Sequence, residues 1–306
     1  MTVDIFFADE IFPEFNSMET VEHDDVVKII KLCHQMGLDS KNMIVRHTDF
    51  NNFDNKFPCT FLYSPKQLLY AQALRDIEHT IPSKHFGAFF GNIGSGIRLK
   101  LLEKMYSNDL LKHSMWTAYN IEYDVNISSE FKRFLELQTP RVYVNDMCFN
   151  VNQAELKEFS YSQQTKYILD TNEYDGFLFQ NSVVNILIDT CAVNRTARYT
   201  TLKVFKPIKF KKPFISTFGK DSLKFLKQLG FKTFDSLWKE TYDEYPAGEA
   251  QFNCMINVMN EIVNTKTIEQ VVSDTNQICE YNYNLLHDTD WNMWFEKQVR
   301  EKYDLR

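Results

Sequence analysis

The chain has 306 residues, of which 44% are hydrophobic, 15% aromatic and 25% charged, and its formal net charge is -7. This length supports one large domain or two ordinary ones, and this composition excludes an intrinsically disordered chain. No apolar run approaches the ~18 residues of a membrane-spanning helix, so we expect a protein without a membrane span.

The N-terminal charges and the cysteines bear on the compartment. The first 27 residues contain eight acidic residues and neither lysine nor arginine, whereas a secretory signal peptide begins with cationic residues. The six cysteines are scattered, without CxxC or Cys/His spacing for a metal, which in a chain of this length favours reduced thiols. We therefore expect a cytoplasmic protein.

The first elements in chain order predict a parallel sheet. Residues 3–8 form a short apolar run typical of a buried strand, and residues 42–47 form the next strand. Between them, Asp24 and Asp25 precede an apolar stripe that Gly37 closes, which predicts a helix. A strand, a helix and a strand in this order are the unit of a parallel sheet covered by helices.

A second alternating series begins near Lys84. The predicted strands span residues 85–90, 114–119, 141–144, 177–179, 183–188 and 213–217, and the predicted helices span residues 97–106, 129–137 and 222–229. Residues 91–96 are glycine-rich and lie between a strand and a helix, where a tight turn or a phosphate-binding loop fits. Arg98 and Lys100 fall in the first turn of that helix and favour phosphate.

The chain ends in a helical segment. Residues 249–264 and 267–286 are predicted helices, and neither glycine nor proline occurs after Gly248. Trp291, Trp294, Phe295 and Val299 follow at helical spacing, so we expect an aromatic face that packs onto the body of the protein. The whole pattern predicts an α/β protein with two open sheets, divided near Pro82, and a helical tail.

Residues 190–220 carry eight lysines or arginines and no acidic residue, while the rest of the chain holds 26 basic against 41 acidic residues. A helix that starts near Thr200 or Thr201 places Lys203 in its first turn, where a cation is unfavourable unless an anion binds there. Pro207 would kink or shorten this helix. The alternatives are a solvated basic face and a nucleic-acid-binding surface.

Residues 184–243 resemble the donor-binding region of viral, phage and bacterial glycosyltransferases related to the fucosyltransferase family. In that family an apolar strand ending in Glu-Thr precedes Thr/Ser-Glu-Lys-x-Phe-Lys-Pro-Ile, Lys-Pro-Phe-Ile, a glycine, Leu-Lys-x-Leu-Gly-Phe-Lys-Thr-Phe and Asp-Glu-x-Tyr-Asp. The matching segments here are residues 188–190, 201–208, 212–215, 219, 226–234 and 239–243. Upstream, residues 89–102 with Arg98 resemble the family's strand followed by an Arg-bearing helix.

The resemblance implies a GT-B architecture, in which two Rossmann-like domains face a cleft. The implied domains are an acceptor-side domain over residues 1–82, a nucleotide-sugar-binding domain over residues 83–248 and a helical tail over residues 249–306. Carried over by position, Lys203 contacts the donor diphosphate, Thr200 and Thr201 supply hydroxyl and N–H donors, and Arg98 neutralises phosphate. The remaining residues expected to bind the donor are Asp189, Arg198 and Lys206.

One departure from the family matters for the donor site, because Leu202 stands where the family has Glu before the lysine. Asp189 at the end of the preceding strand is the candidate to replace it. A transferase that inverts configuration also needs a general base for the acceptor hydroxyl. Asp9, His47 and Asp49 lie at the carboxyl ends of predicted strands of the first domain, where ligands bind in open α/β sheets, and are the candidate catalytic residues.

These features predict a glycosyltransferase that moves a sugar from a nucleotide-sugar donor to a hydroxyl acceptor, which is a glycan or a hydroxymethylated base in phage DNA. We expect no cofactor beyond the nucleotide-sugar and no metal, since Asp288 and Asp290 in the tail fit a helix cap better than a metal motif. For a viral source the compartment is the host cytoplasm. The alternative is a non-catalytic protein that binds nucleic acid or another polyanion through residues 190–220.

Overall fold

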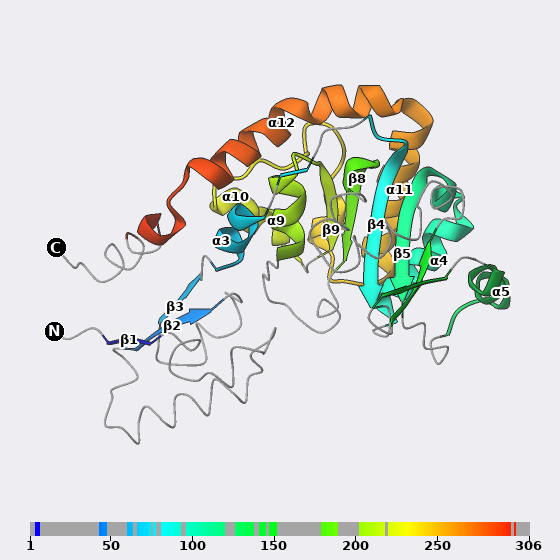
Figure 1. Ribbon diagram of the computed structural model, residues 1–306, viewed down its shortest axis with the longest axis horizontal. Coiled ribbons are helices and arrows are strands. Elements are labelled where there is room, and N and C mark those ends of the chain that lie inside the picture. Colours follow the sequence, from blue (N-terminus) through cyan, green and yellow to red (C-terminus); the bar gives the residue numbers. More distant parts are fainter. Residues whose placement is uncertain are drawn as a thin grey trace, which may run out of the picture.

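The structure is a computed structural model. It describes residues 4–6, 43–47, 60–63, 66–74, 76–77, 81–92, 96–119, 126–137, 141–144, 147–151, 179–188, 202–217, 220–294 and 297. Within these ranges the protein is an α/β protein that contains a parallel sheet and covering helices (Figure 1).

A small parallel sheet comes first in the chain. It consists of β1 (Asp4–Phe6), β2 (Met43–His47) and β3 (Thr60–Tyr63), in that spatial order. The strands predicted over residues 3–8 and 42–47 are therefore confirmed. Helix α3 (Lys66–Ala73) follows β3 and was not predicted.

The main sheet has six strands in the order β6-β7-β5-β4-β8-β9. Its parallel part comprises β5 (Ser114–Tyr119), β4 (Lys84–Asn92), β8 (Ser182–Ile188) and β9 (Phe214–Thr217). At one edge, β6 (Arg141–Val144) and β7 (Met147–Val151) pair antiparallel. Five strands match their predictions. The strand predicted over residues 177–179 is wrong at Phe179, which is helical, while residues 177–178 lie outside the described residues.

The helices also follow the predicted periodicity. Those matching predictions are α4 (Ile97–Ser107), α5 (Ser129–Leu137), α10 (Ser222–Gln228), α11 (Glu249–Thr265) and α12 (Ile268–Asp288). Helix α9 (Leu202–Lys209) lies in the basic segment, and two short 3-10 helices are η3 (Leu110–His113) and η5 (Thr241–Glu244). Among the described residues, no helix is both long enough and apolar enough to cross a membrane.

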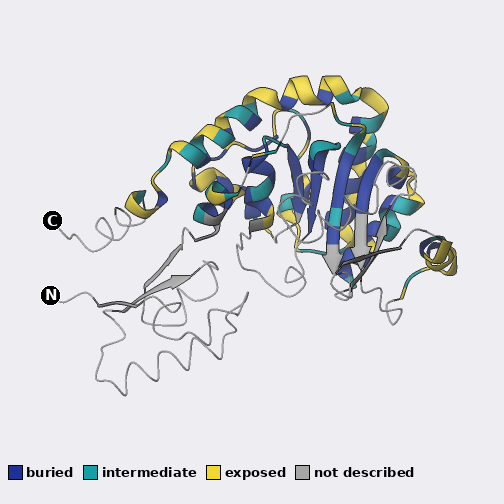
Figure 2. Cartoon of the chain, in the orientation of Figure 1, coloured by how far each residue is buried: buried dark blue, intermediate teal, exposed yellow. Residues whose placement is uncertain are grey.

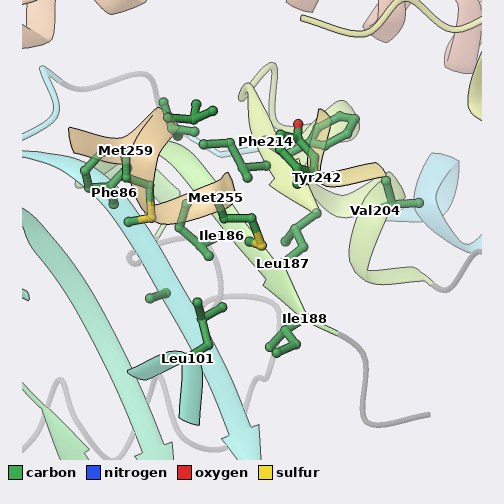
Figure 3. Packing of buried hydrophobic residues seen from close by; sticks show 14 of the residues in the cluster. Phe86, Leu101, Ile186, Leu187, Ile188, Val204, Phe214, Tyr242, Met255 and Met259 are labelled. Atoms are coloured by element: carbon green, nitrogen blue, oxygen red, sulfur yellow. The ribbon is translucent and has the colours of Figure 1, made fainter. Parts of the chain in front are cut away.

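Strand β8 lies at the centre of the core. All seven of its residues are buried, as expected for a parallel strand that is covered on both faces (Figure 2). Figure 3 shows Met255 and Met259 of α11 beside Phe86 and Ile186, while Val204 of α9 lies on the other side of β8. Helices α11 and α9 therefore cover opposite faces of the sheet.

Close approach of β4 and β8 depends on Gly87. A Cβ atom at this position would lie 2.5 Å from Ser182 Oγ and 2.7 Å from the Phe89 ring. These separations are shorter than a van der Waals contact, so only glycine fits without movement of the neighbouring strand.

Helix α12 runs past the amino ends of the central strands (Figure 1). His85 near the start of β4 contacts the carbonyl oxygen of Lys266, just before α12, through Nε2 at 3.1 Å. After α12, Trp291 is 1% exposed and stacks on Phe231 with ring centroids 5.9 Å apart. The predicted aromatic face is thus confirmed at Trp291, whereas Phe295 and Val299 lie outside the described residues.

Candidate anion-binding site

The order of the parallel strands creates a topological switch point between β4 and β8. From β4 the chain passes through α4 to β5 on one side, and from β8 it passes through α9 to β9 on the other. Because β4 and β8 are parallel neighbours, their carboxyl ends are adjacent. Ligands of open α/β sheets bind in the crevice at such a point.

On the β4 side, backbone geometry favours an anion. Gly96 precedes α4 with φ 68°, a left-handed conformation that glycine adopts without strain, and it offers no side chain to cap the helix. The first turn of α4 contains no acidic residue. The register of β4 against β5 also shifts between Phe89 and Asn92, an irregularity often found beside functional sites. The positive end of the α4 dipole therefore lies next to the switch point.

Arg98 lies in this first turn but is buried. Its side chain is 4% exposed, and Nη1 donates a hydrogen bond of 2.7 Å to the carbonyl oxygen of Phe90 in β4. The guanidinium thus joins the start of α4 to the end of β4. It places a positive charge inside the protein close to the switch point, where low solvent screening strengthens its effect on a nearby anion.

On the β8 side, α9 begins at Leu202, so Lys203 lies in its first turn as predicted. The side chain of Lys203 is exposed, whereas Val204 and Phe205 are buried. Helix α9 contains Pro207 and ends at Lys209, in agreement with the shortening expected from proline. Lys206, which is also predicted to bind the donor, lies in α9 and is half-buried.

The second half of the basic segment is occupied by contacts within the protein. Lys209 is 4% exposed and its Nζ lies 2.8 Å from Asp76 Oδ1. Lys211 Nζ lies 2.8 Å from Glu280 Oε2 and 4.4 Å from the centroid of the Tyr283 ring. Lys209 and Lys211 therefore do not belong to a solvated basic face. Asp76, which follows α3, pairs with Lys209, and α12 brings Glu280 and Tyr283 to Lys211.

Lys212 is also removed from bulk water. Burial lowers its pKa to about 8, and burial raises the pKa of the neighbouring Cys279 thiol to about 12. An amine and a thiol in such surroundings both favour their neutral forms. The charge on Lys212 therefore lowers the free energy of unfolding at neutral pH, and this residue does not belong to a solvated basic face.

The motif at residues 239–243 has a structural role that the sequence did not reveal. Asp243 accepts hydrogen bonds from Ser222 Oγ at 2.8 Å and from the backbone N–H of Leu223 at 3.0 Å. It therefore caps α10 from a distance, because Asp221 at the N-cap position has φ 63° and makes no side-chain cap. Glu240 accepts from the Phe234 N–H at 2.8 Å, and burial raises its pKa to about 7.

Several predicted site residues lie outside the described part of the chain: Asp9, Asp49, Asp189, Arg198, Thr200 and Thr201. His47 is the last residue of β2, and only its backbone is described. The described donor-binding candidates are therefore Arg98 in α4 and Lys203 and Lys206 in α9, the helices that follow β4 and β8.

Among the described residues, no cluster of three His, Cys, Asp or Glu side chains is arranged to hold a metal. Asp290 accepts hydrogen bonds of 3.0 Å from the backbone N–H groups of Asn292 and Met293, which confirms that it acts as a helix cap.

Comparison of the chain with protein-family models, with curated proteins and with solved structures gives no match.

Proposed function

We propose that the protein is a GT-B glycosyltransferase that moves a sugar from a nucleotide-sugar to a hydroxyl acceptor. The observation that carries the proposal is that α4 and α9 follow the adjacent parallel strands β4 and β8, with Lys203 exposed in the first turn of α9. A helix that follows a parallel strand begins on the side of the strand's carboxyl end, where ligands of open α/β sheets bind. The leaving group of this reaction is a nucleoside diphosphate. Helix dipoles and a cation stabilise the negative charge that develops on it.

In this proposal Lys203 contacts the diphosphate directly, because it is an exposed cationic residue in the first turn of α9. Arg98 is buried and its hydrogen bond to the carbonyl oxygen of Phe90 holds it in place, so it acts on the same negative charge through the protein interior. Thr200, Thr201, Asp189, Arg198 and Lys206 complete the donor contacts. His47, the last residue of β2, and Asp9 and Asp49, which come shortly after β1 and β2 in the sequence, are the proposed sources of the general base.

The charge distribution favours a small anion over an extended polyanion. Lys209 and Lys211 pair with Asp76 and Glu280, so they are not available to a nucleic acid backbone. Non-specific binding of nucleic acid depends on many phosphate contacts made by exposed cations. A diphosphate needs only a few, and a hydroxyl of a glycan or of a hydroxymethylated base remains the proposed acceptor.

Incubation of the full chain with UDP-, GDP- and CMP-sugars tests the proposal through the release of free nucleotide. We expect one donor class to be hydrolysed slowly without acceptor, and this release to fall in Lys203→Ala. The proposal fails if no donor is bound or hydrolysed. If DNA binding instead survives Lys203→Ala and decreases steeply with salt, the protein is a polyanion-binding module.

A further inference from the structure

Three elements distant in sequence meet at the buried ammonium group of Lys209. Lys209 ends α9, Asp76 follows α3, and His287 lies near the end of α12. Lys209 Nζ is 2.8 Å from Asp76 Oδ1 and 3.1 Å from His287 Nε2. Gln72 of α3 adds a second link to α12, since its Nε2 donates to the carbonyl oxygens of Leu286 at 2.6 Å and Thr289 at 3.1 Å.

The chemistry of the Lys209–His287 contact fixes the protonation state of the histidine. A lysine ammonium has donors and no acceptor, so the hydrogen bond forms only if His287 Nε2 offers a lone pair. A protonated imidazole would instead place two cations at 3.1 Å in a partly buried setting. Coulomb repulsion at this separation is unfavourable, and among the described residues Asp76 is the one carboxylate that forms an ion pair with Lys209 to offset it.

The other groups around His287 do not offset the repulsion between a protonated imidazole and the ammonium group of Lys209. Lys211, two residues after α9, adds a further positive charge, and its carboxylate partner is Glu280. Asp288 on α12 is a second acidic neighbour, and the Tyr283 ring lies 4.4 Å from the imidazole ring, centroid to centroid. Within the part of the chain that the structure describes, the surroundings of His287 thus contain two lysines, two carboxylates and an aromatic ring, with Lys209 in direct contact.

We propose that His287 is a proton-sensitive latch, which in its neutral form holds α12 against α9 and α3 and on protonation releases them. Burial, followed by the charge of Lys209, lowers the pKa of His287, so the latch is closed at neutral pH. Its effect extends along α9, because Lys209 and Lys203 are carried by the same short helix. The latch rests on this cluster alone and does not depend on the proposed transferase activity.

Hydrogen–deuterium exchange on the full chain tests the latch between pH 8 and pH 5.5, with rates corrected for intrinsic exchange. In the wild type we expect peptides from the end of α12 and from α9 to exchange several-fold faster at the lower pH. His287→Gln keeps an acceptor for Lys209 and cannot be protonated, so its exchange should change little with pH. His113→Gln is the matched control and should behave like the wild type, because η3 leads into β5, which β4 and β8 separate from β9 in the sheet, whereas Lys209 precedes β9.

The latch is refuted if exchange of the α12 and α9 peptides in the wild type is independent of pH, or if His287→Gln keeps the full pH dependence. Should His287→Gln fail to fold, Lys209→Met supplies the second test. It removes the cation that opposes protonation, so the imidazole of His287, followed by NMR titration, should take up its proton at higher pH than in the wild type. An unchanged titration would also refute the latch.

Discussion

Lys203 and Lys209 belong to the same helix, yet Lys203 is exposed at its start while Lys209 is buried at its end against Asp76. Lys203 and Lys209 are six residues apart in α9, so their Cα atoms are roughly 9 Å apart along the helix axis. In a β-α-β unit the start of the helix faces the carboxyl edge of the sheet and its end faces the amino edge. The basic segment is therefore divided between a candidate ligand site and a structural contact.

Lys203→Ala should reduce turnover about 100-fold or more, the usual effect of removing one preorganised group that stabilises developing charge. Lys220→Ala is the matched control, since Lys220 is exposed in the same basic segment and no role at the site is proposed for it. The measurement is kcat with whichever nucleotide-sugar proves to be the donor. Equal losses in both variants would indicate a diffuse electrostatic surface instead of a diphosphate contact.

Gly87→Ala should lower the free energy of unfolding by about 1–3 kcal/mol, the range for inserting a methyl group into a packed core. The reason is the 2.5 Å separation between the new Cβ and Ser182 Oγ. Denaturant unfolding measures the change. In a double-mutant cycle, Gly87→Ala with Ser182→Ala should cost less than the sum of the single changes, and simple additivity would contradict the proposed collision.

Glu240→Gln should stabilise the protein above pH 7. The folded-state pKa of Glu240 is raised to about 7 from 4.5, so its contribution to stability is fully present below pH 4.5 and is lost as the pH rises through 7. Glutamine still accepts from the Phe234 N–H and carries no charge. We expect a gain on the order of 3 kcal/mol at pH 8 and almost none at pH 4.5.

Unfolding curves at both pH values check this result. Glu244→Gln is the control, because Glu244 is exposed at the end of η5, the 3-10 helix that Glu240 precedes. A gain that is the same at pH 4.5 and pH 8 would show that the charge of Glu240 is not its cause.

Lys212→Met should raise the free energy of unfolding at pH 7 by about 1–3 kcal/mol. Burial lowers the pKa of Lys212 in the folded state to about 8 from 10.5, so the charged amine destabilises the folded protein at neutral pH. The advantage of the variant should shrink as the pH rises from 8 toward 10.5, where the unfolded chain also loses the proton. Lys211→Met, which removes the ion pair with Glu280, should show no such gain in the same unfolding measurements.

The secondary structure was largely predictable because its causes are local. The apolar run of β8 predicts a buried strand wherever it lies in the fold. Helix α12 begins at Thr267, which accepts from the Gln270 N–H while the Gln270 side chain accepts from Thr267, and this capping box involves only neighbouring residues. The start of α9 near Lys203 follows from the same kind of short-range pattern.

The cap of α10 was not predictable in this way. Asp221 occupies the N-cap position, and a reader of the sequence would assign it the capping role. The backbone there has φ 63° and the cap comes from Asp243, twenty residues after Leu223. Only the packing of η5 beside β9 brings that carboxylate to the helix.

By itself, the sequence determined the alternation of strands and helices, the position of Lys203 at a helix start and the concentration of cations in residues 190–220, because each depends on neighbouring residues. The tertiary structure decided the strand order that makes a switch point between β4 and β8, and it decided which cations remain exposed. Asp76 neutralises the charge of Lys209, and His287 accepts a hydrogen bond from it; both partners come from elements remote in sequence. The free energy of a charge depends on its burial and its partners, and only the fold supplies both.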